Sequence, residues 1–154
     1  MKSRTDQAAT RQARSREAGQ SLVETALFVP IMLIAVLVTA DLGRACYAAI
    51  EVADAARAGV QYGAQSVVTA ADTSGMQTAA KNDAADLSAL NVSATSFCAC
   101  VDGSQVNCIT GTCSSGTPGT YVQVTTSTTF TPLIDYPGLP SSIPLGDTAV
   151  MRVQ

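Results

Sequence analysis

An apolar run near the N-terminus constrains this 154-residue chain more than any other feature of its sequence. Residues 25–40 carry no charged side chain and consist mainly of Leu, Ile, Val, Met, Phe and Ala. A membrane-spanning helix needs roughly 17 to 25 residues, so we expect the span to cover residues 20–40 and to include Glu24. An unpaired carboxyl group in such a span is energetically costly, so Glu24 must have a specific role.

The distribution of charge favours an anchored protein. Residues 1–19 hold five basic and two acidic side chains, a net charge of +3, whereas residues 20–154 hold four basic and ten acidic ones, a net charge of −6. The positive-inside rule therefore places the N-terminus in the cytoplasm and the larger part of the chain outside. An acidic body also argues against nucleic-acid binding, which needs basic residues spread over a folded face.

The composition excludes most familiar catalytic sites. The chain has no His and no Trp, and charged residues make up 14% of it. Acid–base catalysis by His, Ser-His or Cys-His nucleophile pairs, and metal sites with His ligands are thereby excluded. No convergent set of nucleophile, base and orienting group is visible, so we expect a protein that is not an enzyme and has no metal or cofactor.

Other interpretations of the apolar run remain open. A buried helix of a globular domain would need a polar face, which residues 25–40 lack. A secretory signal peptide fits better, because the small residues at 38–40 resemble a cleavage site. In that case the chain would be a secreted, disulfide-stapled binding domain that begins at Asp41.

The hexapeptide GQSLVE at residues 19–24 resembles a type IV prepilin signal. The resemblance implies that a prepilin peptidase cuts after Gly19, so that Gln20 and Glu24 become the first and fifth mature residues. The new amine of Gln20 can pair with Glu24 of a neighbouring subunit and set its register. Because Glu24 lies one helical turn from its own amine, the intramolecular pair competes.

The segment that follows the span reads as a helical stem. Asp41 and Arg44 are three residues apart, a spacing that allows an ion pair at the membrane interface. Residues 45–71 are rich in Ala and continue the helix. Gly59 and Gly63 cost about 1 kcal/mol each in a helix, and their spacing lets another backbone approach closely. The sequence does not say whether that neighbour is the chain's own sheet or another subunit.

A proline lies inside this predicted helix. A helix over residues 22–70 would be roughly 70 Å long and would project beyond the membrane. Pro30 removes the hydrogen bond to the carbonyl of Ala26, so we expect a bend there.

The remaining residues predict a small α+β head. We expect a break at residues 73–75, a helix at 77–90, a hairpin turn at Asp102-Gly103 and a proline-rich loop at 132–144. Alternating or β-branched residues predict four strands, at 95–101, 106–109, 121–131 and 148–153. The fold class is therefore α+β, with a long N-terminal transmembrane α-helix stem and a small C-terminal antiparallel β-sheet head.

Four of the five cysteines lie close together in the predicted hairpin segment 98–113, and an exported body would oxidise them into two bridges. Four cysteines allow three connectivities. We favour the one in which Cys100 pairs with Cys108 and Cys98 with Cys113. A zinc site is disfavoured, because the spacing lacks paired CxxC motifs. We expect the fifth cysteine, Cys46, to be a small buried packing residue, with an intersubunit bridge as the alternative.

Three stretches of the chain together resemble one family. VETALFVP at 23–30, ADLGR at 40–44 and AARAGVQY at 55–62 are similar to the TadE family of pseudopilins from tight-adherence (Tad/Flp) pilus systems. The residues from 122 to 153 are similar more loosely. The departures from the family pattern are Thr25, Asp41 and Gln61.

This resemblance implies a division into three parts and a role in assembly. The parts are a basic leader at 1–19, a transmembrane helix and stem at 20–71, and an extracytoplasmic head at 72–154. The expected partners are a prepilin peptidase, other pilin or pseudopilin subunits, the inner-membrane assembly platform and membrane lipid. The protein would lie in the bacterial inner membrane, enter a pilus as a minor pilin and contribute to surface adherence. A single-pass component of the machinery that never enters the filament is the other alternative.

Overall fold

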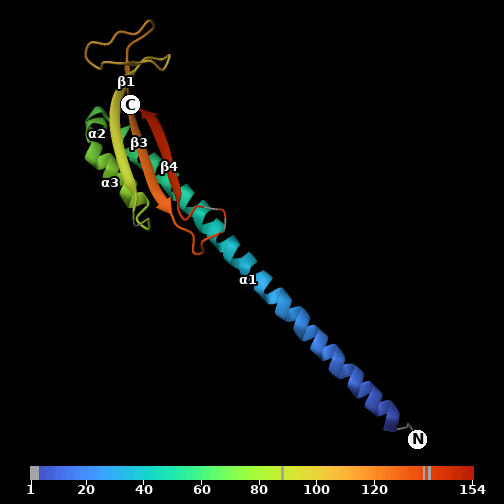
Figure 1. Cartoon of the computed structure of the whole chain (residues 1–154). Coiled ribbons are helices and arrows are strands. Elements are labelled where there is room, and N and C mark those ends of the chain that lie inside the picture. Colours follow the sequence, from blue (N-terminus) through green and yellow to red (C-terminus); the bar gives the residue numbers. More distant parts are fainter. Residues whose placement is uncertain (1–3, 88, 137, 139) are drawn as a thin grey trace. The chain divides into compact units, whose positions relative to one another are not determined.

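The computed structural model describes residues 4–87, 89–136, 138 and 140–154, with side chains described from Gln20 onward. Its elements follow in the order α1 (Arg4–Gly63), α2 (Val67–Ala71), α3 (Thr73–Asp83), β1 (Asn91–Ala99), β2 (Gln105–Val106), β3 (Gly119–Phe130) and β4 (Ile143–Arg152). A long N-terminal helix is followed by a small antiparallel sheet (Figure 1). The predicted α+β class, with a helical stem and a sheet head, is confirmed.

The chain divides into two compact units, residues 1–42 and 43–154. The first contains the N-terminal part of α1, and the second contains the rest of α1 with the two short helices and the sheet. Of the predicted leader, residues 1–3 lie outside the described residues, and residues 4–19 are helical. The functional division at residues 19 and 71 stays a prediction.

The helical stem ends earlier than the predicted residue 71. α1 stops at Gly63, and a separate short helix, α2, begins at Val67. Ser66 starts α2 with a capping box, since its Oγ accepts from the N–H of Thr69 at 3.2 Å while Thr69 Oγ1 accepts from the N–H of Ser66 at 3.0 Å. These two capping hydrogen bonds stabilise a new helix start at Ser66 more than continuation of the Ala-rich α1 would.

The predicted break at residues 73–75 is wrong, because these residues form the first turn of α3. Asp72 caps the helix: its Oδ1 accepts from the N–H of Gly75 at 2.8 Å and from the hydroxyl of Ser74 at 2.7 Å. α3 ends at Asp83, before the predicted residue 90, and residue 88 lies outside the described residues. Ala80 and Ala84 are buried, and Leu87 and Leu90 pack against the core although both lie beyond the end of α3.

The sheet has four strands in the order β2-β1-β3-β4, and all neighbours are antiparallel. β1 begins at residue 91 rather than 95, because β3 is long enough to pair with it from Asn91 opposite Ser127 to Ala99 opposite Gly119. β2 is only two residues long, so the predicted strand at 106–109 is mostly wrong.

The last strand begins inside the predicted proline loop. β4 starts at Ile143 rather than at residue 148 and includes Pro144, which lies opposite Thr129. β4 is an edge strand, and a proline is tolerated at an edge because its missing N–H can face away from the sheet. Residues 137 and 139 of the predicted loop lie outside the described residues.

One face of α1 within residues 43–63 is buried in the head (Figure 1). Val52 and Val60 are each 1% exposed, and Ala55 between them is fully buried. Their spacing places them on one side of the helix. Val122 and Val124 of β3, both fully buried, belong to the same core.

A buried hydrogen bond joins this helix to the centre of the sheet. Thr126 of β3 is fully buried, and its Oγ1 donates to the backbone carbonyl of Val52 at 2.7 Å. Burial of a hydroxyl is costly unless it is hydrogen-bonded, so Thr126 specifies how β3 faces α1.

Gly59 and Gly63 pack inside the head. A Cβ on Gly59 would lie 3.0 Å from both methyl carbons of Val124 and 3.1 Å from the carbonyl oxygen of Met76. A Cβ on Gly63 would collide with Sδ of Met76. The neighbours that these two glycines admit are therefore the chain's own sheet and α3.

We predict that Gly59→Ala destabilises the head by about 1–2 kcal/mol, because overpacking against a rigid valine and a backbone carbonyl exceeds the gain in helix propensity. Gly43→Ala is the matched control, since a Cβ there meets nothing within 4 Å. It should raise stability by up to about 1 kcal/mol. Denaturant unfolding of the full chain in detergent, followed by circular dichroism, measures both. Equal effects of the two substitutions would show that α1 does not approach β3 this closely.

Candidate processing and assembly segment

The first residues of the candidate segment form a side-chain pair on α1. Gln20 Nε2 donates to Glu24 Oε1 at 3.3 Å, and both residues are exposed. The pair is one helical turn long, as the i, i+4 spacing requires. Gly19 lies immediately before it, and α1 continues through this position without a break. A carboxyl group therefore lies beside the residue that cleavage after Gly19 would make N-terminal.

The helix beyond this pair is apolar on every side. Its large hydrophobic residues from Leu22 to Val38 are exposed, and an 18-residue window of the helix from Gln20 to Gly63 has a mean hydropathy of 2.4 with none of it buried. The hydroxyls of Thr25 and Thr39 donate to carbonyls four residues earlier, at 2.9 and 2.8 Å. The two hydroxyls of the run are thus satisfied within the helix, as a lipid environment demands. The helix is long and apolar enough to be a membrane anchor.

Pro30 lies within α1, and the helix continues on both sides of it. The ring nitrogen cannot donate to the carbonyl of Ala26, which leaves that carbonyl without its usual helical partner. The bend at Pro30 stays a prediction.

The predicted interface residues have a partner that the sequence did not reveal. The guanidinium carbon of Arg44 lies 5.4 Å from the centroid of the Phe130 ring, which is buried at the end of β3. A cation over an aromatic face contributes about 0.5–1 kcal/mol at an exposed site. Asp41 is 5% exposed. The ion pair between Asp41 and Arg44 stays a prediction.

The four clustered cysteines form two disulfides, but with another connectivity than expected. Cys98 pairs with Cys108 and Cys100 with Cys113, with Cα–Cα distances of 5.1 and 5.6 Å. The hairpin register gives the reason, because Cys98 lies opposite Val106. Cys108 is thus two residues from the partner of Cys98, near enough to bridge it.

The same register places Cys100 too far from Cys108. The N–H of Cys100 donates to the carbonyl of Ser104 at 2.9 Å, so Cys108 lies four residues beyond the partner of Cys100.

The predicted Asp102-Gly103 turn is confirmed. Gly103 has φ +86°, and Asp102 Oδ1 accepts from the backbone and the hydroxyl of Ser104 at 2.9 and 2.6 Å.

Cys46 is exposed, which corrects the expectation of a buried packing residue. The buried face of α1 contains Ala48 and Val52. Cys46 is two residues from Ala48, a spacing that turns its side chain to the opposite side of the helix.

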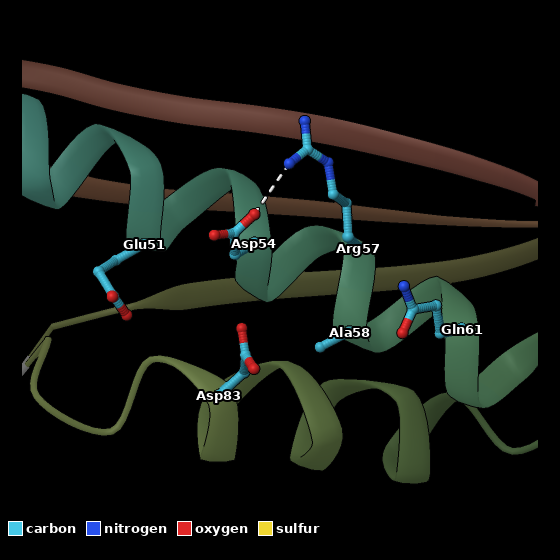
Figure 2. Close-up of a pocket in the computed structure, with 6 residues that line it drawn as sticks. All are labelled: Glu51, Asp54, Arg57, Ala58, Gln61 and Asp83. Atoms are coloured by element: carbon cyan, nitrogen blue, oxygen red, sulfur yellow. Dashed lines mark hydrogen bonds and ion pairs between the residues drawn. The ribbon is translucent and has the colours of Figure 1, made fainter.

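An open cavity of about 350 Å³ lies between α1 and α3. Figure 2 shows its six lining residues: Glu51, Asp54, Arg57, Ala58, Gln61 and Asp83. Arg57 donates to Asp54 at 2.8 Å, but both side chains are at least half exposed, so this ion pair contributes little stability. Among the residues that the structure describes, no group of three or more His, Cys, Asp or Glu side chains is arranged to hold a metal ion.

Two tyrosines of α1 donate hydrogen bonds to carboxylates of the head. Tyr47 Oη donates to Asp86 Oδ2 at 2.9 Å, and this bond, with a second one to Glu51, raises the pKa of Tyr47 to about 12. Tyr62 Oη donates to Asp72 Oδ2 at 2.9 Å, and this bond raises the pKa of Tyr62. Sequence reasoning missed both contacts, since each depends on where α3 lies beside α1.

The structure thus describes an apolar N-terminal helix, long enough to be a membrane anchor, joined to a small α+β head with two disulfides. Residues 19–61 match the family model of TadE-like proteins, which confirms the resemblance seen in the sequence. The match covers 43 of the 154 residues, and the TadE-like family is one of Tad pilus-associated proteins with structural and assembly roles. No match to this chain was found among curated proteins or among solved structures.

The carboxylate of Asp72 makes the stability of the head depend on pH. Hydrogen bonds from Ser74, from the N–H of Gly75 and from Tyr62 lower the pKa of Asp72 below its usual range. A lowered pKa contributes stability that is present above about pH 4, the unfolded value, and is lost as the pH falls toward the folded value. We predict that unfolding becomes easier below about pH 4 and that Asp72→Asn flattens this dependence.

Thermal unfolding between pH 7 and pH 3 measures the effect. The variant keeps part of the slope, because two bonds from Ser104 lower the pKa of Asp102 in the same direction. Parallel curves for the wild-type chain and the variant would show that Asp72 does not retain these bonds in solution.

The disulfide connectivity is tested with matched pairs of substitutions. We predict that Cys98→Ser/Cys108→Ser leaves Cys100 and Cys113 oxidised, so that Cys46 is the one titratable thiol of the denatured protein. The control, Cys98→Ser/Cys113→Ser, leaves two cysteines that the register separates and should give additional free thiol. Each lost bridge should cost about 3 kcal/mol in the chain-entropy description. The reverse thiol counts would show that Cys100 pairs with Cys108 and Cys98 with Cys113.

Proposed function

We propose that this protein is a TadE-like minor pilin that is cut after Gly19 by a prepilin peptidase and assembled into, or at the tip of, a Tad pilus. The observation that carries the proposal is the Gln20–Glu24 pair immediately after Gly19, at the start of an exposed apolar helix. The match to the TadE-like family over residues 19–61 covers the same segment.

The mechanism is assembly. Residues 20–40 anchor the chain in the inner membrane with the head on the extracytoplasmic side, as the basic leader favours. Cleavage creates an ammonium group at Gln20, which neutralises the Glu24 carboxylate of a neighbouring subunit. A mismatched register would leave that carboxylate unpaired in an apolar bundle, and the energetic cost of this selects the correct register.

The head has features suited to an extracellular role. Two disulfides restrain the segment between β1 and β3, and the rest of the head is held by the α1–β3 core. The assembly platform and other pilin subunits are the partners of this proposal, and surface adherence is its biological result. An anchored component of the machinery that stays outside the filament is the remaining alternative.

The test follows both processing and incorporation in a host with and without its prepilin peptidase. We predict a mature protein that starts at Gln20 only when the peptidase is present, and its recovery in sheared pili. Glu24→Ala should be cut normally but recovered in pili at a level reduced by about tenfold or more, as expected for loss of a buried charge pair. Asp54→Ala is the control, because Asp54 lies in the head segment of α1 and its exposed ion pair with Arg57 contributes little stability.

Each of the other results would contradict part of the proposal, and three of them would assign the chain to another class of protein. A start at Asp41 would make the chain a secreted domain, and an uncut chain would leave a signal-anchored membrane protein. Correct processing with no protein in sheared pili would place it in the machinery outside the filament. Equal incorporation of the Glu24→Ala and wild-type proteins would contradict the register role.

A further inference from the structure

We propose that Gln20, once it becomes the N-terminal residue, cyclises to a pyroglutamyl lactam, with Glu24 as the acid–base group. The proposal rests on the proposed cleavage after Gly19. It assigns a chemical modification to the residue that cleavage exposes and a second role to the carboxyl group one turn away.

The geometry that supports it is the contact between the two side chains. The atom of Gln20 that donates to Glu24 Oε1 at 3.3 Å is Nε2, which is the nitrogen that must leave when the lactam forms. Both residues are exposed on α1, so no other element has to move for the reaction to occur. An acid–base group within hydrogen-bond reach of the leaving atom is the arrangement that proton transfer needs.

The step balances without any co-reactant. The α-amine of Gln20 attacks Cδ of its own side chain, so an N–Cδ bond forms and the Cδ–Nε2 bond breaks. Glu24 takes a proton from the attacking amine and delivers one to Nε2, which leaves as ammonia. The carboxylate is regenerated, and nothing is oxidised or reduced.

Cleavage controls the reaction. In the uncut chain the nitrogen of Gln20 belongs to a peptide bond, whose lone pair is delocalised and is a poor nucleophile. Cleavage turns it into an amine, and amine and Cδ then lie in one residue and close an unstrained five-membered ring. Because the two groups are joined, the reaction has the high effective concentration of an intramolecular step.

The consequence is a change in the charge of the mature N-terminus. A freshly cut subunit carries an ammonium group that can pair with Glu24, whereas the lactam is neutral and keeps one N–H to donate to that carboxylate. In a cyclised subunit the lactam N–H therefore replaces the ammonium group as the hydrogen-bond donor to Glu24 of the neighbouring subunit. The charge pair acts while newly processed subunits assemble.

The experiment treats the full-length precursor, purified in detergent, with prepilin peptidase and follows its intact mass over time. We expect the wild-type chain to be cut after Gly19 and then to lose one ammonia, with tandem mass spectrometry locating the loss at Gln20. Pyroglutamyl aminopeptidase should then expose Ser21. Gln20→Ala is the matched control, because its side chain has no amide carbon for the amine to attack and no ammonia to lose. Glu24→Gln keeps the size and the hydrogen bond and should slow the loss by about tenfold or more.

The outcomes separate this proposal from the proposed function. Cleavage after Gly19 with a lasting free amine on Gln20 overturns the lactam and leaves the processing route intact. No cleavage at Gly19 overturns both. An equal loss of ammonia from the Gln20→Ala chain shows that the loss arises elsewhere and overturns the modification. Loss at the wild-type rate in Glu24→Gln overturns the role of Glu24.

Discussion

The close approach of α1 to β3 is the contact on which the rest of the head depends. Small residues on one face of the helix, with Gly59 at the tightest point, allow Val124 to pack against the helix backbone. The bond from Thr126 to the carbonyl of Val52 then selects one alignment of strand and helix. Because β3 pairs with β1 on one side and with β4 on the other, its alignment fixes the positions of both neighbouring strands.

The same helix meets two physical requirements in succession. Over residues 20–40 it is apolar on every side and keeps its few hydroxyls bonded to its own carbonyls, as a helix in lipid must. Over residues 43–63 only one face is buried, and the exposed part carries charged groups such as Arg57. The change from an all-round to a one-sided pattern matches the division of the chain into two compact units.

The N-terminal segment was predictable because its information is local. The apolar run and the GQSLVE motif are read from neighbouring residues, and the family match over residues 19–61 covers both. The basic leader and its removal stay predictions. The disulfide connectivity was not predictable, because it depends on the register of Cys98 opposite Val106. The end of α1 at Gly63 was also missed, because the capping box of Ser66 and Thr69 starts a new helix and competes with continuation of α1.

By itself the sequence determined an α+β chain with an anchoring helix, because hydrophobic periodicity and charge act over short distances along the chain. Tertiary structure alone decided which cysteines pair, which elements pack against Gly59 and Gly63, and that Arg44 lies over Phe130. These contacts join residues far apart in sequence or set by strand register, and their energies depend on distances that only the packed fold defines.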